Sequence, residues 1–132
     1  MEYAIDLLLS LAVAGLAVSL GLDRERAFYP PVLIVIASYY VLFALMAPTG
    51  HVLGIEIAVA SGFLLCAVIG YKTNLWLIAI ATMGHGAFDI IHYFLIENPG
   101  VPRWWPAFCS IIDVILGGLL VVRLMGRRIA AR

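Results

Sequence analysis

Residues 75–96 read LWLIAIATMGHGAFDIIHYFLI, and this segment decides both the fold class and the position of the candidate site. It has about the 20 predominantly apolar residues that a membrane-spanning helix needs, yet it contains His85, Asp89 and His92. Because a helix turns by about 100° per residue, these three side chains fall within roughly 60° on one face. Ionisable groups inside a membrane cost at least about 2.5 kcal/mol each and normally face a bundle interior, a partner or a water-filled cavity. We therefore expect a functional site on this face.

The composition of the whole chain indicates an integral membrane protein. Hydrophobic residues make up 64% of the sequence, charged residues 12%, and the formal net charge is zero. A soluble domain of this size would need more charge to cover its surface, whereas a surface that faces lipid needs none. We expect contact with membrane lipid and no binding to nucleic acid, since the chain offers no basic field.

Five apolar runs follow one another with short polar segments between them. The first run begins with Glu2 and Asp6 rather than with positive charge, so we expect a retained helix and not a signal peptide. Each run is close to the ~20 residues of a spanning helix. We predict an all-α fold in which residues 1–132 form a single transmembrane domain, an integral membrane bundle of five helices at about 3–22, 30–47, 52–70, 75–96 and 104–125.

The lysine and arginine residues predict the orientation of this bundle, because short cytoplasmic loops carry an excess of positive charge. With the N-terminus outside, Arg103 is the one basic residue on the outer side. We therefore predict an N-out, C-in topology. The basic residues on the cytoplasmic side are then Arg24, Arg26, Lys72, Arg123, Arg127, Arg128 and Arg132.

Small residues recur at four-residue spacing in the third run, at positions 54, 58, 62, 66 and 70. This pattern lets helix backbones approach closely. It predicts that the third helix is central in the bundle. The same face, through Gly54, Ala58 and Gly62, offers a surface for a homo-oligomer. Cys66 belongs to this packing row and lies at a different predicted depth from Cys109, so we expect no disulfide between them.

Apart from Arg123 near the cytoplasmic end, the ionisable residues within the predicted helices fall in the outer half of the bundle. This clustering indicates a pocket open to the exterior rather than a channel lined from face to face. Glycines beside His85, and Gly117 and Gly118 on the next helix, would let a neighbouring backbone or a ligand approach. The outer-half residues are Asp6, His51, Glu56, His85, Asp89, His92, Cys109 and Asp113.

Imidazole and carboxylate groups together suit zinc, and can also suit iron or manganese. We predict that His85, His92 and Asp113 bind a divalent metal, zinc first. Asp89 and Glu56 would act as the general base or would orient the ligands. Further pocket candidates are Cys109, Asp6 and His51. The corresponding function is a metal-dependent hydrolase that acts on a lipid or another amphiphile.

The same residues allow other interpretations. His85 and Asp89 can form a hydrogen-bonded pair within one helix, and Asp113 can join two helices, which gives a structural or assembly subunit with a buried polar network. Titration of the cluster would instead give a proton-coupled transporter or a proton-conducting module. A bis-histidine haem would need His51 as its second ligand, because the other histidines share one helix.

Two motifs carry a resemblance to a family of small, uncharacterised bacterial integral membrane proteins. The resemblance implies that both motifs contribute to one site in a multi-pass protein of the bacterial inner membrane, and it implies no activity. The cluster is also similar in kind to the seven-helix zinc hydrolases of the alkaline ceramidase and adiponectin-receptor group, from which this chain departs in its five predicted spans and smaller histidine set. The motifs are His85-Gly86-x-x-Asp89-x-x-His92 and Val101-Pro102-x-Trp104-x-Pro106-x-Phe108-Cys109-x-x-x-Asp113.

Overall fold

The structure, a computed structural model, describes residues 2–47 and 50–129, with the side chains of all of these except Glu2. Every regular element in these residues is a helix, which confirms the all-α prediction. The elements are α1 (Glu2–Ser19), the short 3-10 helix η1 (Leu22–Arg24), α2 (Tyr29–Met46), α3 (Gly50–Lys72), α4 (Leu75–Leu95) and α5 (Trp105–Met125).

Four of the described helices, α2 to α5, are long and apolar enough to cross a membrane, so the chain is a multi-pass integral membrane protein. The first helix, α1, is shorter than predicted, because it ends at Ser19 and not near residue 22. Gly21 follows with φ 72°, a left-handed conformation that glycine adopts at little cost. This residue stops the helix and directs the chain into η1.

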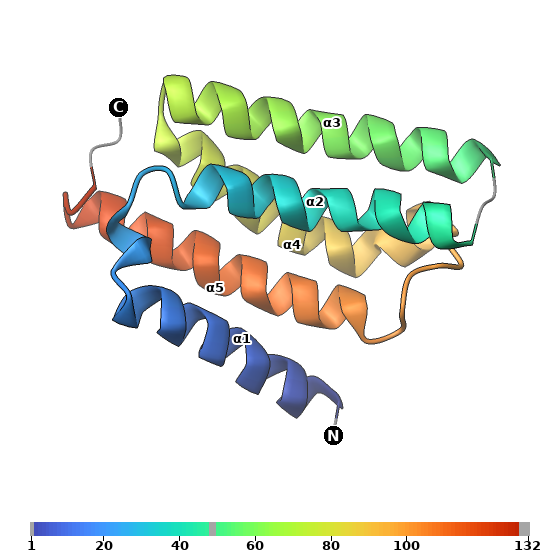
Figure 1. The fold of residues 1–132 in the computed structure, drawn as a ribbon, viewed down its shortest axis with the longest axis horizontal. Coiled ribbons are helices and arrows are strands. Elements are labelled where there is room, and N and C mark those ends of the chain that lie inside the picture. Colours follow the sequence, from blue (N-terminus) through green and yellow to red (C-terminus); the bar gives the residue numbers. More distant parts are fainter. Residues whose placement is uncertain (1, 48–49, 130–132) are drawn as a thin grey trace.

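Consecutive helices run in opposite directions along a common long axis (Figure 1). The contact between α4 and α5 is the most extensive in the bundle, followed by that between α2 and α3. Helix α1 lies along α5 at the edge of the bundle (Figure 1). Helices α4 and α5, which carry both motifs, therefore form the packed centre.

Two glycines allow α4 and α5 to approach closely. A Cβ atom at Gly86 would lie 2.9 Å from the Cβ of Asp113 and 3.1 Å from the backbone oxygen of Ser110. On the other helix, a Cβ at Gly117 would lie 2.5 Å from Cγ of Met83. The predicted close approach is confirmed at these two positions. Gly84 and Gly118 have no described neighbour within 4 Å of such an atom and have no comparable role.

The prediction that the third helix is central is wrong. Only 17% of the residues in an 18-residue apolar stretch of α3 are buried, against 50% in the corresponding stretch of α5. Gly54, Ala58 and Gly62 are exposed. Small residues favour close packing only where another helix is present. In this row that holds for the end near α4, where a Cβ at Gly70 would lie 2.6 Å from Ile78 and the half-buried Cys66 packs against the core. A homo-oligomer through the exposed part of the row stays a prediction.

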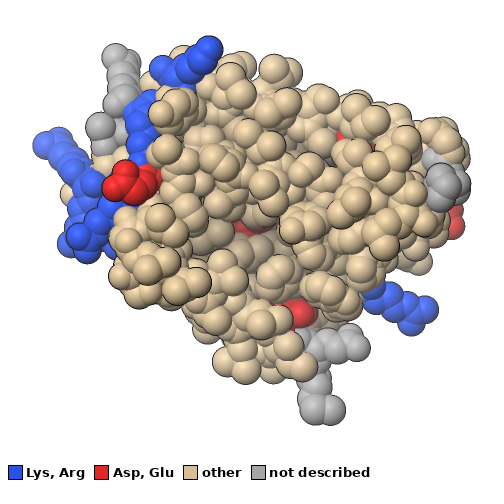
Figure 2. Space-filling model, viewed as in Figure 1, with Lys and Arg blue, Asp and Glu red and all other residues tan. Residues whose placement is uncertain are grey.

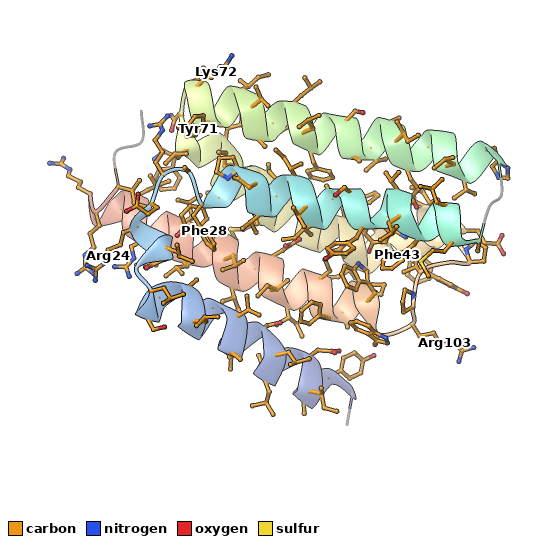
Figure 3. The ribbon with its side chains drawn as sticks, in the orientation of Figure 1. Arg24, Phe28, Phe43, Tyr71, Lys72 and Arg103 are labelled. Atoms are coloured by element: carbon orange, nitrogen blue, oxygen red, sulfur yellow. The ribbon has the colours of Figure 1, made fainter. Side chains whose placement is uncertain are left out.

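Basic side chains gather at one end of the bundle, which we call the basic end (Figure 2). Arg24 and Lys72 lie there, and Arg103 lies at the opposite end (Figure 3). At the basic end Nε of the buried Arg123 donates to Oδ2 of the buried Asp23 at 2.5 Å, so η1 is fixed to α5. This distribution of the described residues is the one that the N-out, C-in prediction requires. Arg132, which also entered that prediction, lies outside the described residues.

Candidate functional site

Four potential metal-binding side chains meet in the middle of the bundle. One ligand atom from each of His85, Asp89, Cys109 and Asp113 lies within 4.8 Å of the others. All four residues are almost completely buried, with exposed fractions of 0% or 1%. We call these four residues the central cluster.

The backbone explains why these residues meet. His85 and Asp89 are four residues apart on α4, and Cys109 and Asp113 have the same spacing on α5, so each pair lies on one helix face. The missing side chain at Gly86 brings the two faces together. Within the cluster, Nδ1 of His85 lies 2.7 Å from Oδ2 of Asp113, a hydrogen bond between the two helices. The sequence had suggested a shared depth for these helices, and the structure adds direct contact.

Two carboxylate oxygens of the central cluster have no hydrogen-bond partner in the described structure, Oδ2 of Asp89 and Oδ1 of Asp113. The first lies 3.4 Å from Nδ1 of His85, close enough for charge attraction. A buried carboxylate without full compensation is costly. The cluster therefore offers two buried carboxylate oxygens to a cation or a proton.

Tyr40 on α2 belongs to the site, although sequence reasoning missed it. Its hydroxyl donates a hydrogen bond of 2.7 Å to Oδ1 of Asp89 and is buried. No spacing pattern marks this residue, because it lies in a helix that is apolar on every face. The available signal was a tyrosine hydroxyl deep in a membrane span, which needs a partner when buried.

His92 does not join the central cluster, which corrects the expected ligand set of His85, His92 and Asp113. Its Nε2 lies 2.8 Å from Oε1 of Glu56 on α3. The side chain of Asn98, in the loop between α4 and α5, donates to the same oxygen at 2.8 Å. We call His92, Glu56 and Asn98 the loop-side group. The physical reason is the direction in which the polar face of α4 points. At His85 it faces Asp113 of α5, whereas at His92 it faces Glu56 of α3.

Tyr40 connects the two groups. Its ring stacks on the ring of His92 with centroids 4.0 Å apart, while its hydroxyl bonds Asp89. Its backbone oxygen also accepts a hydrogen bond of 3.1 Å from Asn98. Asn98 lies in the polar segment between the fourth and fifth apolar runs, and nothing in the sequence there indicates its buried contacts.

The remaining predicted residues lie apart from both groups. His51 is exposed near the start of α3. Asp6 is buried on α1, where it lines a separate cavity of about 280 Å³. A cavity of about 510 Å³ between α4 and the loop before α5 is lined by His92, Asn98 and Arg103 among others. The lining of this cavity reaches the loop-side group rather than the central cluster.

Cys66 and Cys109 are both free thiols, as predicted, and only Cys109 is fully buried. Cys109 was a secondary candidate in the sequence. Its contact with the two aspartates makes it one of the four residues of the central cluster.

Comparison with known proteins relates the chain to a sequence family and to no individual protein. Neither curated proteins nor solved structures include a match to this chain. Residues 52–122, more than half of the chain, match a sequence family described as a short repeat of unknown function. The matched segment covers α3, α4 and most of α5, so it contains the central cluster and the loop-side group, but not Tyr40. A family without an assigned activity is what the resemblance had implied. The chain belongs to this family, the short repeat of unknown function DUF308.

Proposed function

We propose that the chain is a membrane protein whose central cluster binds one divalent metal ion, zinc first. The observation that carries this proposal is the grouping of four potential ligand atoms from α4 and α5 within 4.8 Å. Zinc bonds are about 2.0–2.3 Å long, so two donors of one tetrahedral ion lie about 3.3–3.8 Å apart. Side-chain movements of about 1 Å would bring the four ligand atoms to that spacing.

The types of donor favour zinc over the alkaline-earth ions. The central cluster supplies one imidazole nitrogen, one thiol sulfur and two carboxylate oxygens. Calcium and magnesium prefer oxygen alone, whereas zinc accepts nitrogen, sulfur and oxygen in a tetrahedral set. A divalent ion would also compensate the two unpaired carboxylate oxygens of Asp89 and Asp113.

A metal-dependent hydrolase acting on a lipid or another amphiphile is the finer form of this proposal. A closed set of four protein ligands is typical of structural zinc, while catalytic zinc keeps one position for water. Of the four residues, Asp89 is the one suited to leave that position to water, because its Oδ1 already accepts a hydrogen bond from Tyr40. It would then act as the general base on the bound water. Glu56, the other predicted base, contacts His92 and Asn98 instead.

Metal analysis of the purified protein tests the proposal. Protein prepared without chelators should contain about one zinc per chain, and cobalt substitution should give the absorption of a thiolate ligand. Cys109→Ser should remove the thiolate band, and His85→Ala should lower the zinc content at least about tenfold. Cys66→Ser and His51→Ala are the matched controls and should change neither. Wild-type protein that takes up no zinc or cobalt would rule out the metal site.

A proton-conducting module is the second candidate, and a specific observation favours it. Polar groups form a chain from the hydroxyl of Tyr40 through Asp89 and His85 to Asp113, with separations of 2.7, 3.4 and 2.7 Å. Such chains of titratable groups can carry protons inside membranes. Metal-free protein in liposomes should then pass protons along a pH gradient, and Asp113→Asn should abolish the flux. Equal leakage from protein-containing and empty liposomes would exclude this function.

A further inference from the structure

A second polar site lies between α1 and α5, away from both groups described above. Asp6 is only 4% exposed, and its Oδ2 has no hydrogen-bond partner among the described residues. This carboxylate lines a cavity of about 280 Å³ together with Ile5, Leu9 and Trp104. The buried carboxylate of Asp6 therefore faces a cavity with one oxygen that no described residue satisfies.

Ser10 has the same property one turn further along α1. It is fully buried and its Oγ has no partner in the described structure. Other helical hydroxyls satisfy themselves on the preceding turn, as Ser38 does at 2.8 Å and Ser61 at 2.7 Å. Because Asp6 and Ser10 are four residues apart, they share one helix face and present two unused acceptors.

The surroundings of Asp6 select the ligand. One carboxylate with apolar neighbours is a poor site for a divalent ion, which needs several oxygen ligands. A monovalent organic cation needs less, and an indole ring attracts such a cation through its π face. Trp104 lines the same cavity. A liquid water molecule occupies about 30 Å³, so the cavity has room for a headgroup of several non-hydrogen atoms.

The position in the membrane points to an amphiphile. Asp6 is one turn inside the start of α1, and Trp104 immediately precedes α5, at the end of the bundle opposite the basic end (Figure 1). Tryptophan is common at the level of lipid headgroups. Around the cavity, Ile5 and Leu9 are exposed apolar residues on the outer side of α1, where they can cover an alkyl chain.

We infer that the cavity beside Asp6 binds a primary ammonium group carried on an alkyl chain. The ammonium donates to Oδ2 of Asp6, while the indole of Trp104, which lines the same cavity, covers it. A primary ammonium suits this arrangement because it carries three donors. The group can come from a phosphatidylethanolamine lipid or from a free amphiphilic amine.

Titration of the purified protein with dodecylammonium, in a nonionic detergent, tests the inference. Binding should raise the Tm, because the ligand binds only the folded protein, and should change tryptophan fluorescence, which gives a Kd. Dodecanol, which has the same chain without the charge, should do neither. Asp6→Asn should weaken the Kd at least about tenfold, since a hydrogen bond to a charged group is lost. The control Glu97→Gln changes an exposed acid at the same end and should leave the Kd unchanged.

A second variant keeps the test decisive if Asp6→Asn does not fold. Trp104→Leu changes a side chain that is 46% exposed, and the loss of the π face should weaken the Kd about threefold. Equal Kd values in both variants and the wild type, or an equal effect of dodecanol, would overturn the inference. Nanodiscs separate the two sources: dodecylammonium should lose its effect in phosphatidylethanolamine if that lipid fills the site, and keep it if the ligand is a free amine.

Discussion

The central cluster and the loop-side group are two polar groups built on one face of one helix, and they differ in what faces them. His85 and His92 are seven residues apart on α4 and are both about 1% exposed. His85 meets acids of α4 and α5, and one oxygen of each acid has no hydrogen-bond partner in the described structure. His92 meets Glu56 from α3, and Asn98 from the loop donates to the same oxygen. Two residues on one helix face therefore need not belong to one site, because the helices and loops packed against each residue determine its partners.

The largest expected effect comes from removing His85. In His85→Ala the buried Asp113 and Asp89 lose their common imidazole partner, and breaking a buried ion pair typically costs about 3–5 kcal/mol. We expect this loss in the free energy of unfolding, measured by denaturant titration in detergent. His51→Ala, at an exposed position, should stay within about 0.5 kcal/mol of the wild type. Equal values for the two variants would show that the central cluster is not a stabilising network.

The next effect is expected at the contact that creates the central cluster. Gly86→Ala would push a methyl group against Asp113 and the backbone of Ser110, both of which are held in α5. Such overpacking costs up to about 3 kcal/mol, and the zinc content should fall because α4 and α5 separate. Gly84→Ala is the matched control, since no described atom lies within 4 Å of its added methyl group. A Gly86→Ala protein with unchanged stability and metal content would contradict the close approach.

A smaller effect, and a sharper separation of the two groups, is expected for His92→Ala. Glu56 keeps its hydrogen bond from Asn98 but loses that of the imidazole, at a cost of about 2 kcal/mol for a buried charged acceptor. Zinc content should not change, because His92 is outside the central cluster. Loss of zinc in both His92→Ala and His85→Ala would mean that the two groups act as one metal site, as the sequence alone had suggested.

Much of the fold was predictable because the bilayer restricts the choices. Apolar length identified the helices, and Gly86 and Gly117 were marked as positions of close approach. The four-residue spacing of small residues in α3 led to the wrong prediction of a central helix, because such a row shows that a helix can pack closely and not that a partner helix is present. Depth along the helices correctly grouped His85 with Asp113. The direction in which His92 points was not predictable, because its partner Glu56 lies 36 residues away on α3 and is held in turn by Asn98 of the loop.

The smallest expected effect tests Tyr40, the residue that joins the two groups. Tyr40→Phe keeps the ring that stacks on His92 and removes only the hydroxyl that holds Oδ1 of Asp89. One hydrogen bond is worth about 1 kcal/mol of stability, yet a partner that orients a metal ligand typically changes metal affinity about tenfold or more. Tyr40→Phe should therefore weaken zinc binding more than it weakens the fold, with Tyr39→Phe as the control. If stability falls and zinc affinity does not, Asp89 is not a ligand and the central cluster binds through His85, Cys109 and Asp113.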